Sequence, residues 1–410
     1  MSIVLFEEKS KCCGCGACMN ACPHNAISMK ADEHGFVYPE IQREKCVECG
    51  ACARACGYQK DVGANVPLAC WAAVAKDPSI VNGSSSGGVF AVLALNVLRK
   101  GGVVYGAAQS ETDDARSIQH IRIEAQERLH LLQGSKYVQS VMNDVFRQVK
   151  RDLETKREVL FSGTPCQVAG LRAYLGRKYE QLLTVDVICH GVPSERMFQD
   201  FLQLQEKRQN IRITRFAFRH KERGRIKNVA VQCRMSDGST KRIVRGLHGY
   251  SYLHLFMEGY IFRESCYQCP FASERRASDI TLGDYWSFCE EHPTVRKDAL
   301  NDANGVSCVL LNTEAGQAAF VGCQPQMMTL ETTFDKIARH NEQLRRPSHK
   351  PTGREELLRD YQACGYAGME AYYRRKCIKR RLVCGMKDLA PASLKRLIRR
   401  AKGTLRAHGK

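Results

Sequence analysis

The sequence predicts a multidomain protein of mixed α+β and α/β class, with a small cysteine-rich domain, a larger α/β body and a basic helical tail. Two cysteine repeats of identical spacing fall within residues 11–57, and alternating strand and helix patterns begin at residue 79. Residues 371–410 hold fourteen Lys or Arg and one acid, so they carry +13 of the net charge of +19. We place the domains at 1–62, 63–155, 156–350 and 351–410, the second and third being the two parts of the body.

The composition indicates a chain that folds around a sizeable core in a reducing compartment. Its 410 residues are 44% hydrophobic, which suffices for two or three domains. The 21 cysteines would form disulfides in a short secreted protein, but the opening "MSIVLFEEKS" lacks the pattern of a signal peptide. The longest nearly apolar stretch, "GGVFAVLALNVL", is too short to span a bilayer. We therefore expect a cytoplasmic protein whose clustered cysteines bind metal.

Both cysteine repeats have the spacing C-x2-C-x2-C-x3-C. They consist of Cys12, Cys15, Cys18 and Cys22 followed by Pro23, and of Cys46, Cys49, Cys52 and Cys56 followed by Gly57. In a 4Fe–4S protein of this spacing, three thiolates of one repeat bind one cube and the fourth reaches the other cube. We predict one cube on Cys12, Cys15, Cys18 and Cys56, and a second on Cys46, Cys49, Cys52 and Cys22.

Zinc is the alternative for these cysteines, and it is disfavoured because zinc sites prefer two separated C-x2-C pairs. Cys13 lies between ligands, and we expect its side chain to point away from the clusters. The N-terminal 60 residues resemble a two-cluster bacterial ferredoxin, which implies a pseudo-twofold pair of βαβ units around the cubes.

The body shows strand and helix signals in alternation. "SIVNGSSSGGVFAVLALNVLRKGG" predicts a Ser/Gly loop that opens an apolar helix ending at Gly101–Gly102, and "GVVYGAA" predicts the next strand. "EVLFSGTPCQVAGLRAYLG" predicts a buried strand and a helix from near Pro165, and "LLTVDVICHGVPS" predicts another buried strand. This order favours an α/β domain.

The Ser/Gly loop, residues 84–88, lies at a predicted helix N-terminus, where free N–H groups and the helix dipole favour a phosphate. The alternative is a well-capped helix with a flexible lead-in. The sequence has no G-x-G-x-x-G or Walker A pattern, which disfavours ordinary NAD-type and P-loop functions.

A series of longer motifs carries a specific resemblance. They are "SSSGGVF", "QGSKYVQS", "VLFSGTPCQVAGLRAYL", "VDVICHGVPS", "CYQCPF", "SDITLGDYW" and "NGVSCVLLNTEAG". In this order they resemble the coenzyme F-420 (deazaflavin) hydrogenase/dehydrogenase beta-subunit family, over roughly residues 5 to 345. The resemblance implies FAD in the α/β domain and electron exchange between flavin and iron–sulfur clusters. Members of the family include deazaflavin-dependent enzyme subunits and ferredoxin-dependent reductases.

Residue by residue, the resemblance implies contacts to the flavin. The loop assigned to the flavin phosphates contains Ser85, Ser86, Gly87 and Gly88. Lys136 would place a cation near the flavin or its pyrophosphate, unless it is an ordinary surface lysine, and Tyr137 could pack on a ring. Arg225 departs from the family, which usually has an aromatic residue there, so substrate contacts at that position are in doubt.

Four further cysteines lie inside the matched motifs: Cys166, Cys189, Cys266 and Cys269. Cys166 opens a predicted helix, a position that lowers a thiol pKa and suits a ligand or a nucleophile. The resemblance implies a third 4Fe–4S cluster on these four residues. The alternatives are zinc, or a reactive Cys166 in redox chemistry.

His190 is the candidate catalytic residue, because its ordinary pKa near neutrality suits proton donation beside a flavin. A loop histidine that only bonds the backbone is the alternative. Asp186, Asp279 and Asp284 are strand-end acids that could serve the active site, a helix cap or a core salt bridge equally well.

The tail, "PASLKRLIRRAKGTLRAHGK", places apolar residues at helical spacing from Leu394 to Leu405, with Lys and Arg on most other faces. Such a basic amphipathic helix can lie at an anionic membrane surface, dock an acidic partner such as a ferredoxin, or pack on its own domain. We favour peripheral association with the inner membrane face. The body has no basic stripe interleaved with aromatics, so we expect no nucleic-acid partner.

The sequence therefore predicts a flavin- and iron–sulfur-dependent oxidoreductase that passes electrons between FAD and an external carrier of ferredoxin or deazaflavin type. Two 4Fe–4S clusters would connect them. The alternative is a non-catalytic electron-transfer subunit of a larger redox complex.

Overall fold

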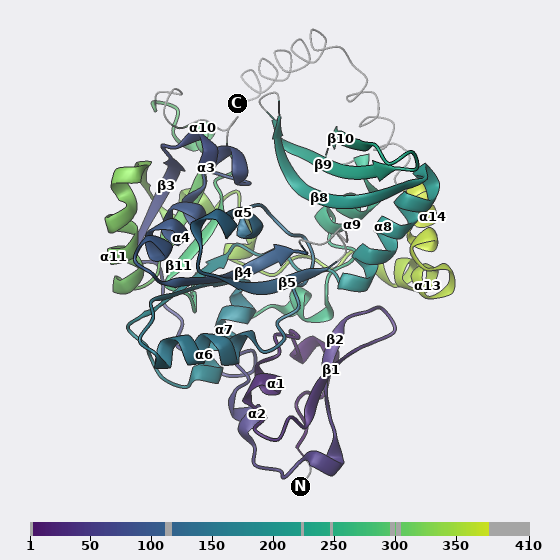
Figure 1. The fold of residues 1–410 in the computed structure, drawn as a ribbon, viewed down its shortest axis with the longest axis horizontal. Coiled ribbons are helices and arrows are strands. Elements are labelled where there is room, and N and C mark those ends of the chain that lie inside the picture. The colour runs from purple at the N-terminus through teal and green to yellow at the C-terminus, as the bar shows by residue number, and fades with distance from the viewer. Residues whose placement is uncertain are drawn as a thin grey trace.

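The computed structural model describes residues 3–110, 117–222, 225–246, 249–295, 300 and 305–376, with the backbone alone for residues 222 and 225–227. Figure 1 shows the N-terminal domain below a large sheet, and a smaller curved sheet beside the large one. Arg225, singled out above, is among the residues without a described side chain.

The N-terminal domain consists of one hairpin and two short helices. Its elements are α1 (Ala17–Ala21), β1 (Ile27–Ala31), β2 (Val37–Ile41) and α2 (Ala51–Arg54), and β1 pairs antiparallel with β2. Each helix follows a glycine in the left-handed region, Gly16 at φ 75° and Gly50 at φ 69°. The two cysteine repeats thus have equivalent local structures, while β1 and β2 are the only strands described in this domain.

The large sheet has eight strands in the order β13-β3-β12-β11-β7-β6-β4-β5. Their bounds are β3 (Ala69–Ala75), β4 (Val103–Gln109), β5 (Ile118–Ile123), β6 (Val159–Gly163), β7 (Leu182–Val187), β11 (Ile280–Asp284), β12 (Ser307–Leu311) and β13 (Met327–Thr332). The central strands β4, β6, β7 and β11 are parallel, and the strands on both sides pair antiparallel. The predicted α/β body is therefore a mixed sheet.

Helices cover both faces of this sheet. They are α3 (Pro78–Gly83), α4 (Val89–Arg99), α5 (Leu129–Leu132), α6 (Val145–Glu154), α7 (Pro165–Leu175), α10 (Phe288–Glu291), α11 (Glu314–Cys323) and α12 (Phe334–Ala338). Val104 packs in the core formed with α4, whereas the adjacent Val103 packs in the core formed with α6 and α7. This alternation is the period of two expected for a strand buried on both faces. Figure 1 shows α6 and α7 between the sheet and the N-terminal domain.

The smaller sheet, in the order β10-β9-β8, packs against helices. Its elements are α8 (Glu195–Gln209), β8 (Ile211–Glu222), β9 (Arg225–Met235), β10 (Thr240–Gly246), α9 (Ser251–Met257), α13 (Arg354–Cys364) and α14 (Tyr366–Lys376). Their core is aromatic, with Phe198, Phe216 and Tyr252 at its centre. Leu357 and Met369 from α13 and α14 lie in the same core, so the first part of the predicted tail packs on the body. The basic amphipathic helix predicted at 391–406 lies outside the described residues.

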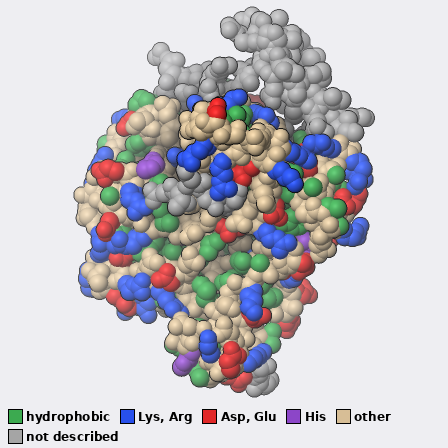
Figure 2. All heavy atoms as spheres, turned by 45° about the vertical axis from the view of Figure 1, so that its right-hand side comes forward, with side chains coloured by type: hydrophobic (Ala, Val, Ile, Leu, Met, Phe, Trp, Pro, Cys, Tyr) green, Lys and Arg blue, Asp and Glu red, His purple; other side chains and the backbone are tan. Residues whose placement is uncertain are grey.

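Among the described helices, none is both long and apolar enough to cross a membrane. On the face drawn in Figure 2, Lys and Arg side chains are interspersed with Asp and Glu.

Candidate metal centres and cofactor site

The first group of cysteines comes from both repeats of the N-terminal domain. It consists of Cys12, Cys15, Cys18 and Cys56. Burial raises the pKa of the Cys12 thiol to about 11, and the Cys15 and Cys56 thiols contribute to the rise. Burial also raises the pKa of Cys18, again with contributions from the other members. The four sulfurs therefore lie within electrostatic reach of one another, in the interleaved grouping that the spacing predicts.

The second group, Cys22, Cys46, Cys49 and Cys52, lines one small pocket at the outer end of the domain. Burial raises the pKa of Cys52, and the Cys22 and Cys46 thiols raise it further. Cys49 is exposed, as is the neighbouring Val47. This group is thus the one nearest to solvent.

The third group, Cys166, Cys189, Cys266 and Cys269, brings together the start of α7, the loop after β7 and the 3-10 helix η5 (Glu264–Gln268) with its C-cap. Burial raises the pKa of Cys266 and of Cys269 to about 12, with neighbouring thiols of the group contributing in both cases. Burial also raises the pKa of Cys189, to which the other three thiols contribute. Four cysteines that lie up to 103 positions apart therefore share one half-buried site.

A capping box fixes Cys166 at the start of α7. The Thr164 side chain and the Gln167 side chain satisfy the first amides of the helix. Thr164 Oγ1 lies 3.2 Å from the Cys166 sulfur. Gln167 is held in turn by Ser140, whose hydroxyl also contacts His120. The position of Cys166 is thus determined by a buried polar network.

The described cysteine groups are not closed to the spacing of a bound zinc ion. Within the described part of the chain, the sole set of three potential ligand atoms within 4.8 Å of one another belongs to Asp32, Glu33 and His34. A tetrahedral zinc site with bonds of about 2.3 Å would hold its sulfurs only about 4 Å apart.

Cys13 does not turn away from the ligands, contrary to the expectation above. Its buried side chain packs in one core with Cys15 of the first group and Cys166 of the third, and both thiols raise its pKa. The Cys13 thiol is the main cause that lowers the pKa of Cys166 to about 7. The expectation rested on crowding within the first repeat and ignored the body, whose helix α7 packs on this turn.

Small residues allow the N-terminal domain to approach α7 closely. A Cβ atom at Gly170 would lie 2.8 Å from the Cys15 sulfur, so a larger residue would displace this sulfur. On the other side of the contact, Arg147 of α6 donates to the carbonyls of Asn20, Met19 and Cys22 at 2.8–3.2 Å. The domain is therefore held to the body beside two of its cysteine groups.

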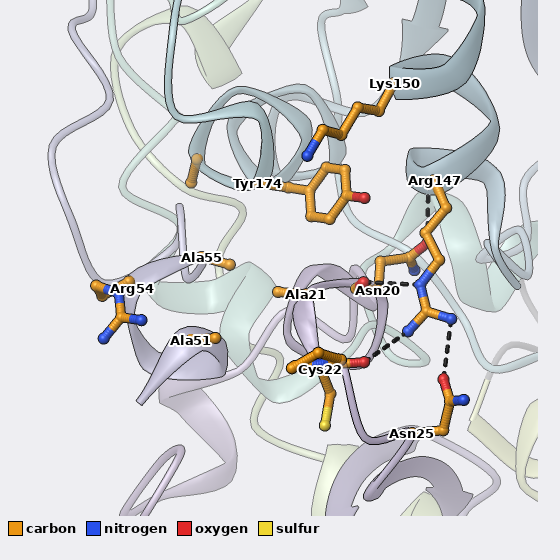
Figure 3. A pocket seen from close by; sticks show the side chains of 12 residues that line it. Asn20, Ala21, Cys22, Asn25, Ala51, Arg54, Ala55, Arg147, Lys150 and Tyr174 are labelled. Atoms are coloured by element: carbon orange, nitrogen blue, oxygen red, sulfur yellow. Dashed lines mark hydrogen bonds between the residues drawn. The ribbon is translucent and has the colours of Figure 1, made fainter. Parts of the chain in front are cut away.

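A cleft of about 450 Å³ opens beside the second group of cysteines (Figure 3). Its lining includes Cys22, Arg54, Arg147 and Lys150, and contains no Asp or Glu. Figure 3 shows Lys150 directed toward the ring of Tyr174, and Arg147 occupied by hydrogen bonds. The cleft is therefore electropositive and lies at the outermost cysteine group.

His190 follows Cys189 of the third group and lies toward the Ser/Gly loop, which is predicted to bind the flavin phosphates. Burial lowers its pKa, and the Asp284 carboxylate opposes that effect. Asp284 in turn bonds Arg219 at 3.0 Å, while its other carboxylate oxygen is buried without a hydrogen-bond partner. Arg219 reaches the Ser85 carbonyl at 3.5 Å. Hydrogen bonds thus join Asp284 to the Ser/Gly loop through Arg219, and the Asp284 charge acts on His190 beside the third group.

Strand β8 supplies two cations to that loop. Arg219 and Lys221 lie where the register of β8 is irregular, and both side chains reach carbonyls of the Ser/Gly loop. Lys221 Nζ donates to the Ser86 and Val81 carbonyls, each at 2.6 Å. Burial lowers the pKa of Lys221 to about 8.

Lys136 lies close by and is also bonded to carbonyls. Its Nζ donates to the Leu131 and Gln133 carbonyls at 3.0 and 2.9 Å. Burial lowers its pKa to about 7, and Arg215 contributes. The preceding Ser135 bonds the Ser85 hydroxyl at 2.8 and 2.9 Å, which connects the two predicted flavin segments.

The two glycines of the loop, Gly87 and Gly88, also have structural roles. The Gly87 amide donates to Ser307 Oγ at 2.9 Å, and a Cβ atom at Gly87 would lie 2.2 Å from the Ala73 carbonyl oxygen. Gly88 caps α4 at φ 87°. Tyr137 stacks on Phe256 with 4.4 Å between ring centroids and accepts a hydrogen bond from Arg219.

Asp186 and Asp279 serve the core of the sheet. Asp186 forms a fully buried ion pair with Arg276 at 3.1 Å. Asp279 accepts from Thr184 and pairs with Arg172 at 2.9 Å. Of the three strand-end acids, Asp284 is the one next to His190.

Comparison with known proteins gives the family. The models of the coenzyme F420 hydrogenase/dehydrogenase beta subunit match residues 70–147 (N-terminal part) and 156–335 (C terminus), and a 4Fe-4S dicluster domain model matches residues 11–60. The chain belongs to the F420 hydrogenase/dehydrogenase beta-subunit family. It is thus an oxidoreductase subunit whose dicluster domain carries two 4Fe–4S clusters.

Several chains of solved structures match. Among them is a chain of the F420-reducing [NiFe] hydrogenase complex from Methanosarcina barkeri, in its xenon derivative, with 14% identity and a TM-score of 0.41, covering 76% of this chain and 93% of that chain. No curated protein matches.

Several residues of this site lie outside the predictions made from the sequence. Arg219 and Lys221 fall in "FRHKERGRIKN", which drew notice only for Arg225. The density of cations in this segment was the available signal. Arg263 donates to the Cys12 carbonyl at 3.0 Å and to Gln139 Oε1 at 3.0 Å, so both residues lie beside the first group. Neither residue was singled out from the sequence.

Proposed function

We propose that this beta-subunit family member exchanges electrons between an external carrier and FAD through three 4Fe–4S clusters, the third on Cys166, Cys189, Cys266 and Cys269. The observation that carries the proposal is the buried Cys13, which packs in one core with Cys15 of the dicluster domain and Cys166 of the body. A single side chain spans the two sets of ligands, so the clusters would lie in direct succession. Electrons would enter or leave at the second cysteine group, whose Cys49 is exposed to solvent, and would pass between it and the body through the first group.

The Ser/Gly loop supports the binding of an anion such as the FAD diphosphate. Lys136 and Lys221 have only backbone carbonyls as hydrogen-bond partners, and Arg219 is the sole one of the three paired with a described carboxylate, that of Asp284. Buried cations without counter-ions are costly, and a diphosphate would neutralise them. Ser85 and Ser86 would orient the phosphates through their backbone, whereas the Gly87 amide is already bonded to Ser307.

Bound FAD would supply the conversion between two-electron and one-electron transfer. The residues of the chain then set charge and proton supply. His190 is favoured in its neutral form by burial, so it can accept a proton from a donor beside the third group and return it. The unpartnered oxygen of Asp284 is the nearest stabiliser of a protonated His190.

Anaerobic purification with iron, sulfide and flavin quantified together tests the proposal. We expect about twelve irons per chain and one FAD. Lys221→Met should lower the flavin content and leave iron unchanged, while Lys76→Met, which removes an exposed lysine bonded to the Pro325 carbonyl, should alter neither. Full flavin occupancy in both variants would contradict the assignment of this loop.

The alternative is an electron-transfer subunit whose partner chain performs the substrate reaction. Turnover of any donor–acceptor pair by the purified single chain would rule it out. Iron and flavin at full content without turnover would favour it.

A further inference from the structure

Arg263 is a fully buried cation with no carboxylate partner among the described residues. Among the residues that the structure describes, three arginines have less than 5% of their surface exposed: Arg263, Arg276 and Arg354. Arg276 pairs with Asp186 at 3.1 Å, and Arg354 pairs with Glu264 at 3.1 Å. Arg263 is completely buried, and its hydrogen-bond acceptors are neutral. Proteins seldom bury a charge in this way unless something else compensates for it.

The guanidinium is held in one orientation. It donates to the Cys12 and Val37 carbonyls and to Gln139 Oε1, and it lies 4.2 Å from the centroid of the Tyr38 ring. Gly14 leaves the necessary space, because a Cβ atom there would lie 2.9 Å from the guanidinium carbon. The geometry is thus built around a permanent positive charge.

Both neighbouring cysteine groups lie within reach of this charge. The Cys12 carbonyl accepts from Arg263 Nε at 3.0 Å, which places the guanidinium on the loop of the first group. The Arg263 carbonyl accepts from the Cys266 amide at 2.9 Å, and its own amide donates to Val192, so its backbone forms the turn of the third group. Arg263 lies between the two sets of ligands.

We propose that Arg263 is the internal counter-ion shared by the cluster on Cys12, Cys15, Cys18 and Cys56 and the cluster on Cys166, Cys189, Cys266 and Cys269. A 4Fe–4S cube with four thiolates is negatively charged and gains a further negative charge on reduction. A buried cation between two such cubes favours the reduced state of both. It therefore raises both reduction potentials together and keeps the difference between them, which drives electron transfer from one cube to the other, small. For the third cluster, this inference rests on the function proposed above.

Two substitutions test the charge separately from the packing. Arg263→Gln removes the cation. Gln139→Glu keeps the arginine and places a carboxylate at the position that now accepts from it at 3.0 Å. Both should lower the potential of the adjacent clusters in an EPR-monitored redox titration. We expect at least a tenfold shift of the one-electron equilibrium toward the oxidised state, which is about 59 mV. Arg263→Lys keeps the charge and should stay close to wild type.

The control is Arg122→Gln, because this arginine is already neutralised by Asp152 and lies outside the cysteine groups. It should leave every potential unchanged. If the Arg263→Gln protein loses its iron, the Gln139→Glu protein still tests whether the Arg263 charge affects the cluster potentials. Cluster potentials equal to those of wild type in the Gln139→Glu protein, at full iron content, would overturn the proposal.

The iron content of the wild-type protein tests the third cluster independently of the Arg263 proposal. A wild-type protein with about eight irons would refute that part of the proposed function. The first cluster would remain next to Arg263, and its potential would still test the counter-ion role.

Discussion

Gly57 lies directly on the backbone of α7: a Cβ atom at this position would stand 2.2 Å from the Ala169 carbonyl oxygen. Gly57 occupies the place where the ferredoxin-type spacing usually has proline. The fusion to a body explains the departure, since any side chain here would push the dicluster domain off the helix. The contact lies next to Cys56, so it also fixes one ligand of the first cluster.

Gly57→Ala should therefore destabilise the protein by at least about 2 kcal/mol through overpacking. The loss should show first as faster proteolysis between the dicluster domain and the body. Gly322→Ala is the matched control, because nothing lies within 4 Å of its Cβ position in α11. It should be neutral or stabilising by about 0.5–1 kcal/mol. Equal melting temperatures for the two variants would disprove the contact.

Cys166→Ala should remove about four irons per chain if the third group holds a cube. The capping box of Thr164 and Gln167 does not involve the Cys166 sulfur, so α7 should persist in the variant. Cys364→Ala, which changes an exposed cysteine, should keep all iron. An unaltered iron content and EPR spectrum in Cys166→Ala would refute the third cluster.

Cys13→Ala should now have an effect, whereas the sequence alone suggested none. Its thiol packs with Cys15 and Cys166, and its S–H group can donate to ligand sulfurs. Because such hydrogen bonds favour the reduced cluster, the adjacent potentials should fall. The iron content should stay at the wild-type value. Redox titration measures the shift, and unchanged potentials would show that Cys13 only fills space.

Lys136 predicts a pH dependence of stability in flavin-free protein. Its pKa is about 7 when folded, against about 10.4 in an unfolded chain. Between these values the unfolded chain binds the proton more tightly than the folded protein does. The loss of folding stability that buried Lys136 causes is therefore complete below about pH 7 and fades as pH rises toward 10. Lys136→Met should therefore gain more stability relative to wild type at pH 6.5 than at pH 9. Melting curves at both pH values check this, and a difference independent of pH would contradict it.

The electropositive cleft predicts that an acidic carrier protein approaches the outermost cluster. Lys150→Glu should slow reduction by an acidic ferredoxin at low ionic strength by about tenfold or more. Reduction by methyl viologen should not change, because a small cation needs no docking surface. Lys100→Glu, on the exposed end of α4, serves as the control. Equal ferredoxin rates in the two variants would place the carrier elsewhere.

The features that can be predicted from the sequence are largely local. The helix from Val89, the strand–turn–helix around Thr164 and the strand β7 follow from apolar runs, caps and glycine stops, and the structure confirms them. The curved sheet β8–β10 and its aromatic core were not predicted, because they depend on which aromatic residues meet in three dimensions.

The sequence by itself determined the two cluster-binding repeats, because ligand spacing within one loop is a local property that a cube requires. It also identified the third set of cysteines through their motifs. Only the tertiary structure decided that these four meet, that Cys13 joins them to the first group, and that Arg263 lies between both. The physical reason is that electrostatic compensation and close packing act through space. A buried charge and the groups that neutralise it need no proximity along the chain.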